Sequence, residues 1–300
     1  MKKSTLMVAA LAFVVTTAFA QDLTSKKGEP ILPEAGDYSI GIDATPFLNY
    51  FGNFIGGNGL NAAPGWNHLN GLNTIVGKMY VTPNMAYRGI LRIGLNSNTS
   101  KAMIGDASVT TPPTYPNLPA MKEDVMKSSS SFIGLGAGLE YRRGKTRLQG
   151  FYGAEAFLWT SASSSKYTYG NALSSTVTVN GGTTTNFGTN TLNDTYGNSA
   201  RSITNKSGRT IGIGVRGFVG AEYFIIPKLS VGGEFGWGVG FSTTGASSNE
   251  IESVNGATPG KQTLEGTSSN QLILDTDRNA FGTGATQFAP SASLRLNFHF

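Results

Sequence analysis

Eight segments of this chain place apolar residues at every second position, the pattern of an extended strand whose two faces meet different surroundings. In SFIGLGAGLEYR (131–142) the odd positions from Ile133 to Tyr141 are apolar, and the even positions between them are glycine or glutamate. After residue 20, no stretch is long and apolar enough to cross a bilayer as a helix. The chain is therefore expected to be all-β, with strands near 38–50, 73–82, 85–97, 131–142, 147–160, 210–224, 229–242 and 286–300.

The connections between these segments alternate in length. Three are tight and turn-like: Pro83-Asn84, RGKT (143–146) and IIPK (225–228). The others are long and rich in Gly, Ser, Thr and Asn, and they cover 51–72, 98–130, 161–209 and 243–285. Long structureless loops are unusual in a compact soluble domain. The alternation predicts an antiparallel up-and-down barrel with long loops on one side and both chain ends on the other.

Composition agrees with this prediction and narrows the chemistry. Charged residues make up only 14% of the chain, and 40 residues are glycine, which suits short strands and polar loops better than a helical core. There is no cysteine, so disulfides, thiolate catalysis and cysteine metal sites are excluded. The net charge of +5 is not concentrated in a basic cluster, which gives no support for nucleic-acid binding.

The first twenty residues have the form of a secretory signal peptide. Lys2 and Lys3 precede an apolar run, and Ala18-Phe19-Ala20 places small residues where a signal peptidase cleaves. An uncleaved membrane anchor is the alternative, but the apolar run is short for a span of ~20 residues. We expect a signal peptide at 1–20, a periplasmic lead-in at 21–37 and a barrel at 38–300.

An exported chain without a spanning helix enters a membrane only as a closed barrel. Charges within the segments then belong on the inward face, because a cation facing lipid near the midplane costs ~2–4 kcal/mol. The alternation predicts an interior charge network of Asp43, Lys78, Arg88, Arg92, Glu140, Glu155, Arg216, Glu222, Glu234 and Arg295. Tyr38, Tyr87, Tyr141 and Tyr223 have outward phase next to the short turns, as in an aromatic girdle.

Three stretches carry a resemblance to a known class of proteins: GIDATPFLNYFGN (41–53), IVGKMYVTPNMAYRGILRIGL (75–95) and SLRLNFHF (293–300). In them the sequence resembles bacterial outer-membrane β-barrel proteins, especially small eight-stranded OmpA/OmpX-like barrels of the Bacteroidota. The resemblance implies an outer-membrane location among its lipids. It also implies that the final strand, with outward Leu294, Leu296, Phe298 and Phe300, is part of the signal read by the barrel-assembly machinery. Pro46 and Pro290 depart from a regular strand ladder.

Motif-like strings give little sign of catalysis or ligand binding. GIGVRG (212–217) has dinucleotide-like glycines but no following helix signal, and RRGKT (142–146) lacks the first glycine of a phosphate loop. Asp275, Asp277 and Asn279 are spaced like the start of a calcium loop, but that loop's glycine and terminal glutamate are missing. No metal or cofactor is expected.

Histidine and hairpin signals leave two smaller questions. No serine is marked out by spacing as a partner for His68 or His299. We therefore expect His68 to be a loop residue and His299 a barrel-end residue, and neither to form a hydrolase site. Residues 176–187 alternate around Asn180-Gly181, a hairpin signal. If that hairpin joins the wall, the barrel has ten strands instead of eight.

These observations predict a non-enzymatic outer-membrane barrel. An eight-stranded barrel is just wide enough for its own side chains to fill, so paired interior charges suggest a polar plug. Function is then expected in the external loops, as a structural or interaction protein or as an accessory subunit of an envelope complex. A narrow small-solute channel is the first alternative, and a lipid-modifying enzyme is the second.

Overall fold

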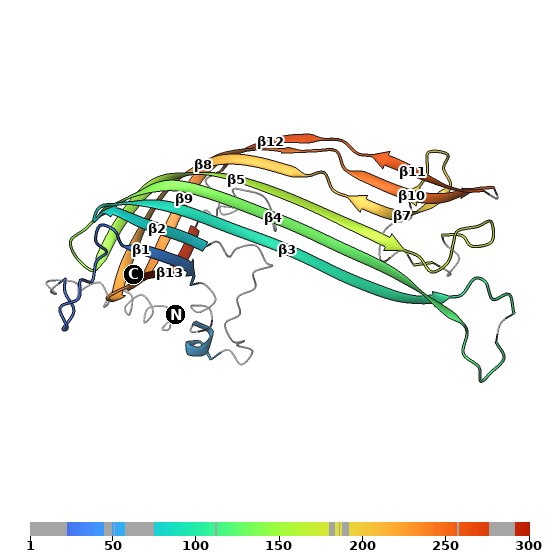
Figure 1. Ribbon diagram of the computed structural model, residues 1–300, viewed down its shortest axis with the longest axis horizontal. Helices are drawn as coiled ribbons and strands as arrows, with labels where there is room; N and C mark the ends of the chain where they lie inside the picture. The colour runs from blue at the N-terminus through green and yellow to red at the C-terminus, as the bar shows by residue number, and fades with distance from the viewer. Residues whose placement is uncertain are drawn as a thin grey trace, which may run out of the picture.

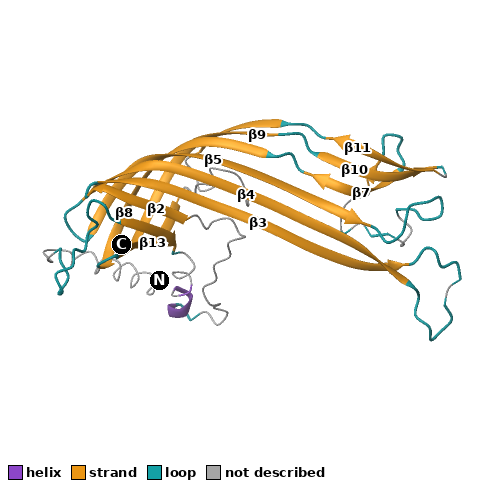
Figure 2. Cartoon of the chain, viewed as in Figure 1, coloured by secondary structure: helices purple, strands orange, loops and turns teal. Residues whose placement is uncertain are grey.

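The structure is a computed structural model, and most of the residues it describes lie in antiparallel β-strands (Figure 2). Residues 52–55 form a helical turn. The described residues are 23–44, 50, 52–57, 75–111, 113–179, 184–185, 187, 192–256, 258–275 and 292–300. The all-β prediction is confirmed. The signal-peptide prediction, Pro46, His68 and Pro290 lie outside these residues.

Eight strands form a closed ring in which each strand is hydrogen-bonded to the next. The last strand pairs with the first, from Ser39 opposite His299 to Asp43 opposite Arg295, and the ring has no free edge there. In ring order the strands are β1 (Tyr38–Asp43), β2 (Ile75–Thr82), β3 (Met85–Gly105), β4 (Met121–Arg143), β5 (Leu148–Thr168), β8 (Thr210–Ile226), β9 (Leu229–Thr244) and β13 (Ala292–His299).

The three tight connections lie where the sequence predicted them. Pro83-Asn84 joins β2 to β3, residues 144–147 join β4 to β5, and Pro227-Lys228 joins β8 to β9. Lys228 has a φ of +67°, the left-handed conformation used in tight turns. These turns therefore lie at one end of the ring, the same end as the C-terminal residue.

The prediction of long structureless loops is wrong for 98–130, 161–209 and 243–285, because strands run far into these three segments. β3, β4 and β5 extend beyond the apolar segments, and β3 stays paired with β4 without a break from Met85 to Gly105. Serine hydroxyls bridge β4 and β5 at Ser128–Ser165 (3.0 Å) and Ser129–Ser164 (2.9 Å). Backbone pairing needs no apolar face, so alternation detects only the part of each strand whose two faces differ.

Five more strands lie in the predicted loops 161–209 and 243–285, so the described residues hold thirteen strands in total. Figure 1 shows β7, β10 and β11 at the end of the sheet opposite the C-terminus. β7 and β8 both pair with β5, at different positions along it and in the same direction. β12 and β13 both pair with β9 in the same way. The added strands are β6 (Leu192–Asn193), β7 (Ser199–Lys206), β10 (Ser248–Asn255), β11 (Thr258–Glu265) and β12 (Ser269–Asp275).

The chain is interrupted between β7 and β8, between β9 and β10 and between β11 and β12, and the three interruptions lie side by side in the sheet. The breaks are at 207–209, 245–247 and 266–268, and they are linked by backbone bonds from Gly245 N to Arg209 O (3.0 Å) and from Gly266 N to Ser247 O (2.7 Å). At Gly208 an added Cβ would overlap the carbonyl oxygen of Gly245. Close backbone approach therefore requires glycine at this line, which separates the ring from the outer sheet formed by β7, β10 and β11.

The predicted end of the first strand needs correction. The segment 38–50 ends as a strand at Asp43, since Tyr50 and residues 52–55 are helical, and the final strand is described only from Ala292. The predicted hairpin at 176–187 is not seen in its described part: 176–179, 184, 185 and 187 are bends, turns or coil. Nothing there supports the ten-strand alternative.

Each ring strand has a buried face and an exposed face. In β9 every second residue from Ser230 to Ser242 is buried, while Phe235, Trp237, Val239 and Phe241 between them are exposed. Inside the ring, an apolar cluster of Val76, Ile90, Phe132, Phe157 and Trp159 fills the space. Glycine makes room for these rings: a Cβ on Gly214 would lie 2.6 Å from Phe157.

The lead-in at 23–37 is folded back on itself rather than extended. Thr24 and Pro30 form an isolated bridge, and Ile31 is only 1% exposed. Gly36 N donates to Tyr80 O (2.7 Å), and Tyr80 N donates to Asp37 O (2.8 Å). These bonds attach the segment to β2 at the short-turn end of the ring.

The outer sheet and the adjoining ends of the ring strands have buried polar groups of their own. The Asp124 carboxylate is fully buried and accepts the backbone N–H groups of Gly170 and Thr185 (both 2.8 Å). Asp194 accepts from the N–H and side chain of Asn198, from Tyr196 N and from Ser253 Oγ (2.7 Å). Hydrogen bonds, first from the Asn198 side chain, lower the pKa of Asp194 to about 2. This carboxylate joins the β6–β7 turn to β10.

We expect acid to loosen this joint between about pH 4 and pH 2. A carboxyl whose folded pKa lies below its usual ~3.9 stabilises the fold above that range and loses the contribution as pH falls through the folded value. Pepsin should cut wild-type protein near 192–200 faster at pH 2 than at pH 4, relative to a denatured standard. Asp194→Asn should already be sensitive at pH 4. Equal resistance of both proteins at both pH values would contradict the role of Asp194.

Candidate functional site: a buried ion-pair network

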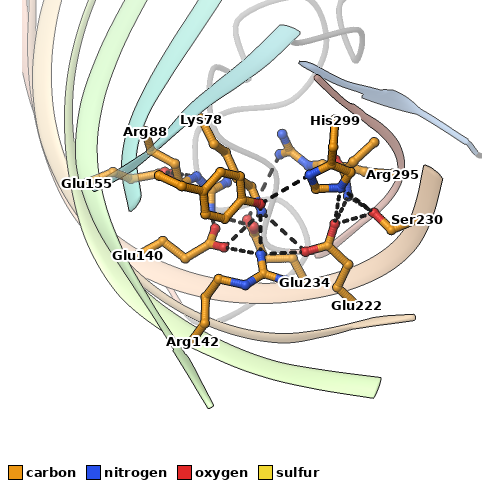
Figure 3. Close-up of polar contacts among 12 residues, drawn as sticks. Lys78, Arg88, Glu140, Arg142, Glu155, Glu222, Ser230, Glu234, Arg295 and His299 are labelled. Carbon is orange, nitrogen blue, oxygen red and sulfur yellow. Dashed lines mark hydrogen bonds and ion pairs between the residues drawn. The ribbon is translucent and has the colours of Figure 1, made fainter. Parts of the chain in front are cut away.

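A cluster of charged side chains fills the ring near its short-turn end (Figure 3). Its members come from seven different strands and share the inward phase of the period-two pattern, which is why residues far apart in sequence meet. All are buried. They are Lys78, Arg88, Glu140, Arg142, Glu155, Arg216, Glu222, Glu234, Arg295 and His299.

One half of the network is centred on two carboxylates bridged by two cations. Glu140 Oε1 lies 2.9 Å from Lys78 Nζ and 3.0 Å from Arg142 Nη1. Glu222 Oε2 lies 2.7 Å from Arg142 Nη1 and 3.7 Å from Lys78 Nζ. Both carboxylates are fully buried. Each acid therefore has two compensating cations, as burial of a charge requires.

The other half is centred on Glu234 and continues from the first. Glu234 is 2.7 Å from Arg88 Nη1 through one oxygen and 2.8 Å from Arg216 Nη1 through the other, with Arg295 at 4.0 Å. Arg216 also contacts Glu155 at 2.8 Å. Arg88 lies 3.5 Å from Glu140, so the two halves form one continuous network.

Aromatic rings cover several of the cations. The Arg88 guanidinium lies 4.1 Å from the Phe218 ring centre, and Lys78 Nζ lies 4.9 Å from that of Phe151. Such cation–π contacts strengthen when water is excluded. The interior at this level is therefore packed with alternating acids, bases and rings.

A serine, a histidine and a glutamate meet at one side of the network. His299 Nε2 lies 2.9 Å from Ser230 Oγ and 3.3 Å from Glu222 Oε1, and the Ser230 hydroxyl also donates to Glu222. His299 Nδ1 faces the Tyr80 hydroxyl at 3.5 Å. In a catalytic triad the acid orients the histidine nitrogen that faces away from the serine. Here the acid contacts the same nitrogen as the serine, and all three side chains are buried.

The structure brings eight of the ten predicted interior residues into this network. Arg92 is buried higher in the ring, with its guanidinium 4.3 Å from the Phe132 ring centre. For Asp43 the structure describes only the backbone, which pairs with Arg295. The eight are Lys78, Arg88, Glu140, Glu155, Arg216, Glu222, Glu234 and Arg295.

The sequence prediction omits five participants, all with inward phase. Arg142 follows Glu140 by two residues, so alternation alone marks it as inward. The other four are not Asp, Glu, Lys or Arg, so a search for those charged residue types does not find them. The omitted residues are Tyr80, Arg142, Ser230, Asn297 and His299.

The predicted aromatic girdle and final strand lie on the outer face. Tyr38, Tyr87 and Tyr141 are 50%, 48% and 41% exposed, and Tyr223 is half-buried. Tyr38 stacks on Phe300 with ring centres 6.4 Å apart. Phe298 and Phe300 are exposed, while Leu294 and Leu296 are half-buried.

The other motifs do not form sites in the described chain. GIGVRG continues as the strand β8, as expected. No group of histidine, cysteine or acidic side chains suited to a metal is found among the described residues, and Asp277 and Asn279 lie outside them. Within the same residues no helix is both long and apolar enough to span a membrane.

Comparison with known proteins adds no family assignment. No protein-family model matches the sequence, and no curated protein matches it.

We expect Glu222→Gln to destabilise the protein by about 3–5 kcal/mol, because it leaves the buried Lys78 and Arg142 undercompensated. The midpoint of urea unfolding, followed by tryptophan fluorescence, measures the change. Glu123→Gln is the matched control, since Glu123 forms an exposed ion pair with Lys101 and such pairs contribute ~0–1 kcal/mol. Equal unfolding midpoints for the two variants would show that the network does not stabilise the ring.

Proposed function

We propose that this protein is an integral outer-membrane barrel that does not conduct and that acts through its outer sheet. In this proposal the ring of eight strands spans the membrane, and the extended strands project from the cell. The single observation that carries the proposal is the contrast between the two faces of the ring: charges are buried inside, and apolar side chains are exposed outside.

The exposed apolar side chains support membrane insertion. They form a belt around the ring, whereas soluble monomers rarely expose large contiguous apolar patches. On β3 the belt runs from Tyr87 to Leu95, about 27 Å along the strand at ~3.4 Å per residue, which at a tilt of ~35–45° covers most of an apolar band ~25 Å tall. Typical members are Ile93, Leu135, Leu158, Ile213, Val215, Trp237, Val239 and Phe241, each 37–61% exposed.

The two rims of the belt also fit a bilayer. At the short-turn end lie Tyr38, Tyr87 and Tyr141, together with Tyr152, which stacks on Tyr141 at 5.8 Å between ring centres. At the other end the outward residues change to serine, from Ser131 on β4. Tyrosine at an interface and polar strands beyond it are typical of outer-membrane barrels.

The buried network supports a closed interior. The side chains of Arg88 and Glu140 are both 0% exposed, and that of Arg216 is 1% exposed. A water-filled path past these residues would leave them accessible. We therefore favour a plug over a channel, and the buried Ser230 and His299 give no support for a lipid-modifying enzyme.

The outer sheet and the neighbouring β3–β4 connection offer a surface for a protein partner. Tyr115 and Leu118, between β3 and β4, are 98% and 88% exposed, and Tyr196, in the β6–β7 turn, is 75% exposed. Large apolar side chains on an ordered scaffold are typical anchors of protein interfaces. An accessory role in an envelope complex follows from these anchors.

The plug predicts that purified, refolded protein produces no steady conductance in a planar bilayer. Insertion must be shown in the same preparation by flotation with liposomes and by a folded band that shifts on heating before electrophoresis. A reproducible conductance from inserted protein would contradict the plug and favour the narrow channel.

If Tyr115 and Leu118 anchor a partner protein, the double variant Tyr115→Ser and Leu118→Ser should release it. Tagged wild-type protein, extracted from its own membrane in mild detergent, should migrate as a discrete large assembly on native electrophoresis. The double variant should migrate as a monomer with an unchanged heat-shifted band. Ile55→Ser, which alters an 82% exposed side chain elsewhere, is the control. A monomeric wild-type protein would refute the accessory role.

A further inference from the structure

Four basic side chains gather on the outward face just beyond the apolar belt. Lys127 on β4 lies directly opposite Lys166 on β5, and Lys206 on β7 lies opposite Ser164, two residues from Lys166. Arg209 follows on the same side and donates to Thr160 Oγ1 at 3.5 Å. All four are exposed. Their outward phase places them on the face that carries the belt.

These cations lack acidic partners, unlike their neighbours. Lys101 pairs with Glu123 at 3.0 Å, and Lys122 pairs with Asp106 at 2.9 Å. In the part of the chain that the structure describes, no ion pair includes Lys127 or the other three. Like charges placed directly opposite on neighbouring strands destabilise a sheet. An anion bound between them would remove that cost.

A polar groove of about 610 Å³ lies beside these cations. Lys206 and Arg209 line it, together with a row of serines that includes Ser129, Ser164 and Ser207. Hydrogen bonds between Ser129 and Ser164 (2.9 Å) and between Ser163 and Ser207 (2.9 Å) orient the hydroxyl groups. Cations and hydroxyl donors together suit phosphate oxygens.

An apolar groove of about 690 Å³ lies further down the same strands. Its wall includes Leu135, Leu158, Ile213, Phe241 and Leu272, and small residues such as Ala137 and Ala156 form its floor. From Ser131 in the polar groove to Leu135 in the apolar groove is about 14 Å along β4, at ~3.4 Å per residue. β4 and β5 lie side by side along this whole length (Figure 1).

We propose that these two grooves together bind a phosphorylated lipid of the outer leaflet. The phosphate lies among Lys127, Lys166, Lys206 and Arg209, and the acyl chains lie in the apolar groove. Charge complementarity identifies the head group, and a cationic groove and an apolar groove about 14 Å apart on the same two strands indicate an amphiphile rather than a soluble anion. This inference rests on the proposed membrane insertion, because the apolar groove faces the bilayer only if the belt does.

The test compares lipid binding by four-site variants of equal charge. Lys127, Lys166, Lys206 and Arg209 are changed to Gln in one protein. In the control, Lys26, Lys27, Lys145 and Lys228, exposed at the short-turn end, are changed to Gln. Each protein is placed in zwitterionic nanodiscs doped with diphosphorylated or dephosphorylated lipid A, and retained lipid is counted by native mass spectrometry.

Wild-type and control proteins should retain the phosphorylated lipid at least about tenfold more strongly than the dephosphorylated one, since each cation near an anionic surface contributes on the order of fivefold. The four-site variant should lose this preference. No preference in wild-type protein, or a preference lost equally in the control, would overturn the inference. Displacement of the lipid by millimolar inorganic phosphate would also overturn it, because the site would then take a soluble anion.

Insertion is scored separately by flotation and by the heat-shifted band. Protein that does not insert refutes both the proposed function and this inference. Protein that inserts without a phosphate preference refutes the inference alone.

Discussion

Hydrogen bonding between β1 and β13 is the contact on which the rest of the structure depends. These two short strands, at opposite ends of the chain, pair over five residues from Ser39 to Asp43. Their pairing closes the ring, and closure divides every strand into an inner and an outer face. Without it the inward charges of β3, β4, β5, β8 and β9 would line an open trough instead of a sealed interior, where water would weaken each ion pair.

The buried network is better understood as a device for specificity than as a source of stability. Removing charges from water is costly, and well-packed apolar residues often stabilise a core as much or more. A slip of one residue in strand register would, however, move Glu140 or Arg216 to the apolar outer face. Networks that join Lys78 on β2 to Glu222 on β8 are satisfied only when all strands are in register. The energetic cost of every other strand register therefore favours the one register in which the charges are paired.

Above the belt the same strands change their chemistry while keeping their backbone pairing. β4 passes from Leu135 to a run of serines with no break in its ladder with β5. The outward face thereby changes from apolar to polar side chains, and the line of breaks at Gly208, Gly245 and Gly266 lies beyond this change. A rigid wall can thus present Tyr115, Leu118 and the basic cluster at fixed heights above one rim.

The sequence by itself determined which residues alternate, and alternation was enough to predict the ring strands, their tight turns and the inward phase of Glu140, Arg216 and Glu234. This succeeded because a period of two follows from the geometry of an extended chain and needs no knowledge of neighbours. It failed where both faces are polar, as in 98–105, 121–130 and 161–168, because pairing there leaves no apolar signal.

Only the tertiary structure decided which charges touch. Ser230 and His299 are 69 residues apart, and no local pattern relates them; the direct pairing of β13 with β9 brings them together. Likewise Lys127 meets Lys166 only through the register of β4 on β5. Phase is a property of each strand alone, whereas contact depends on the order and register of all the strands around the ring.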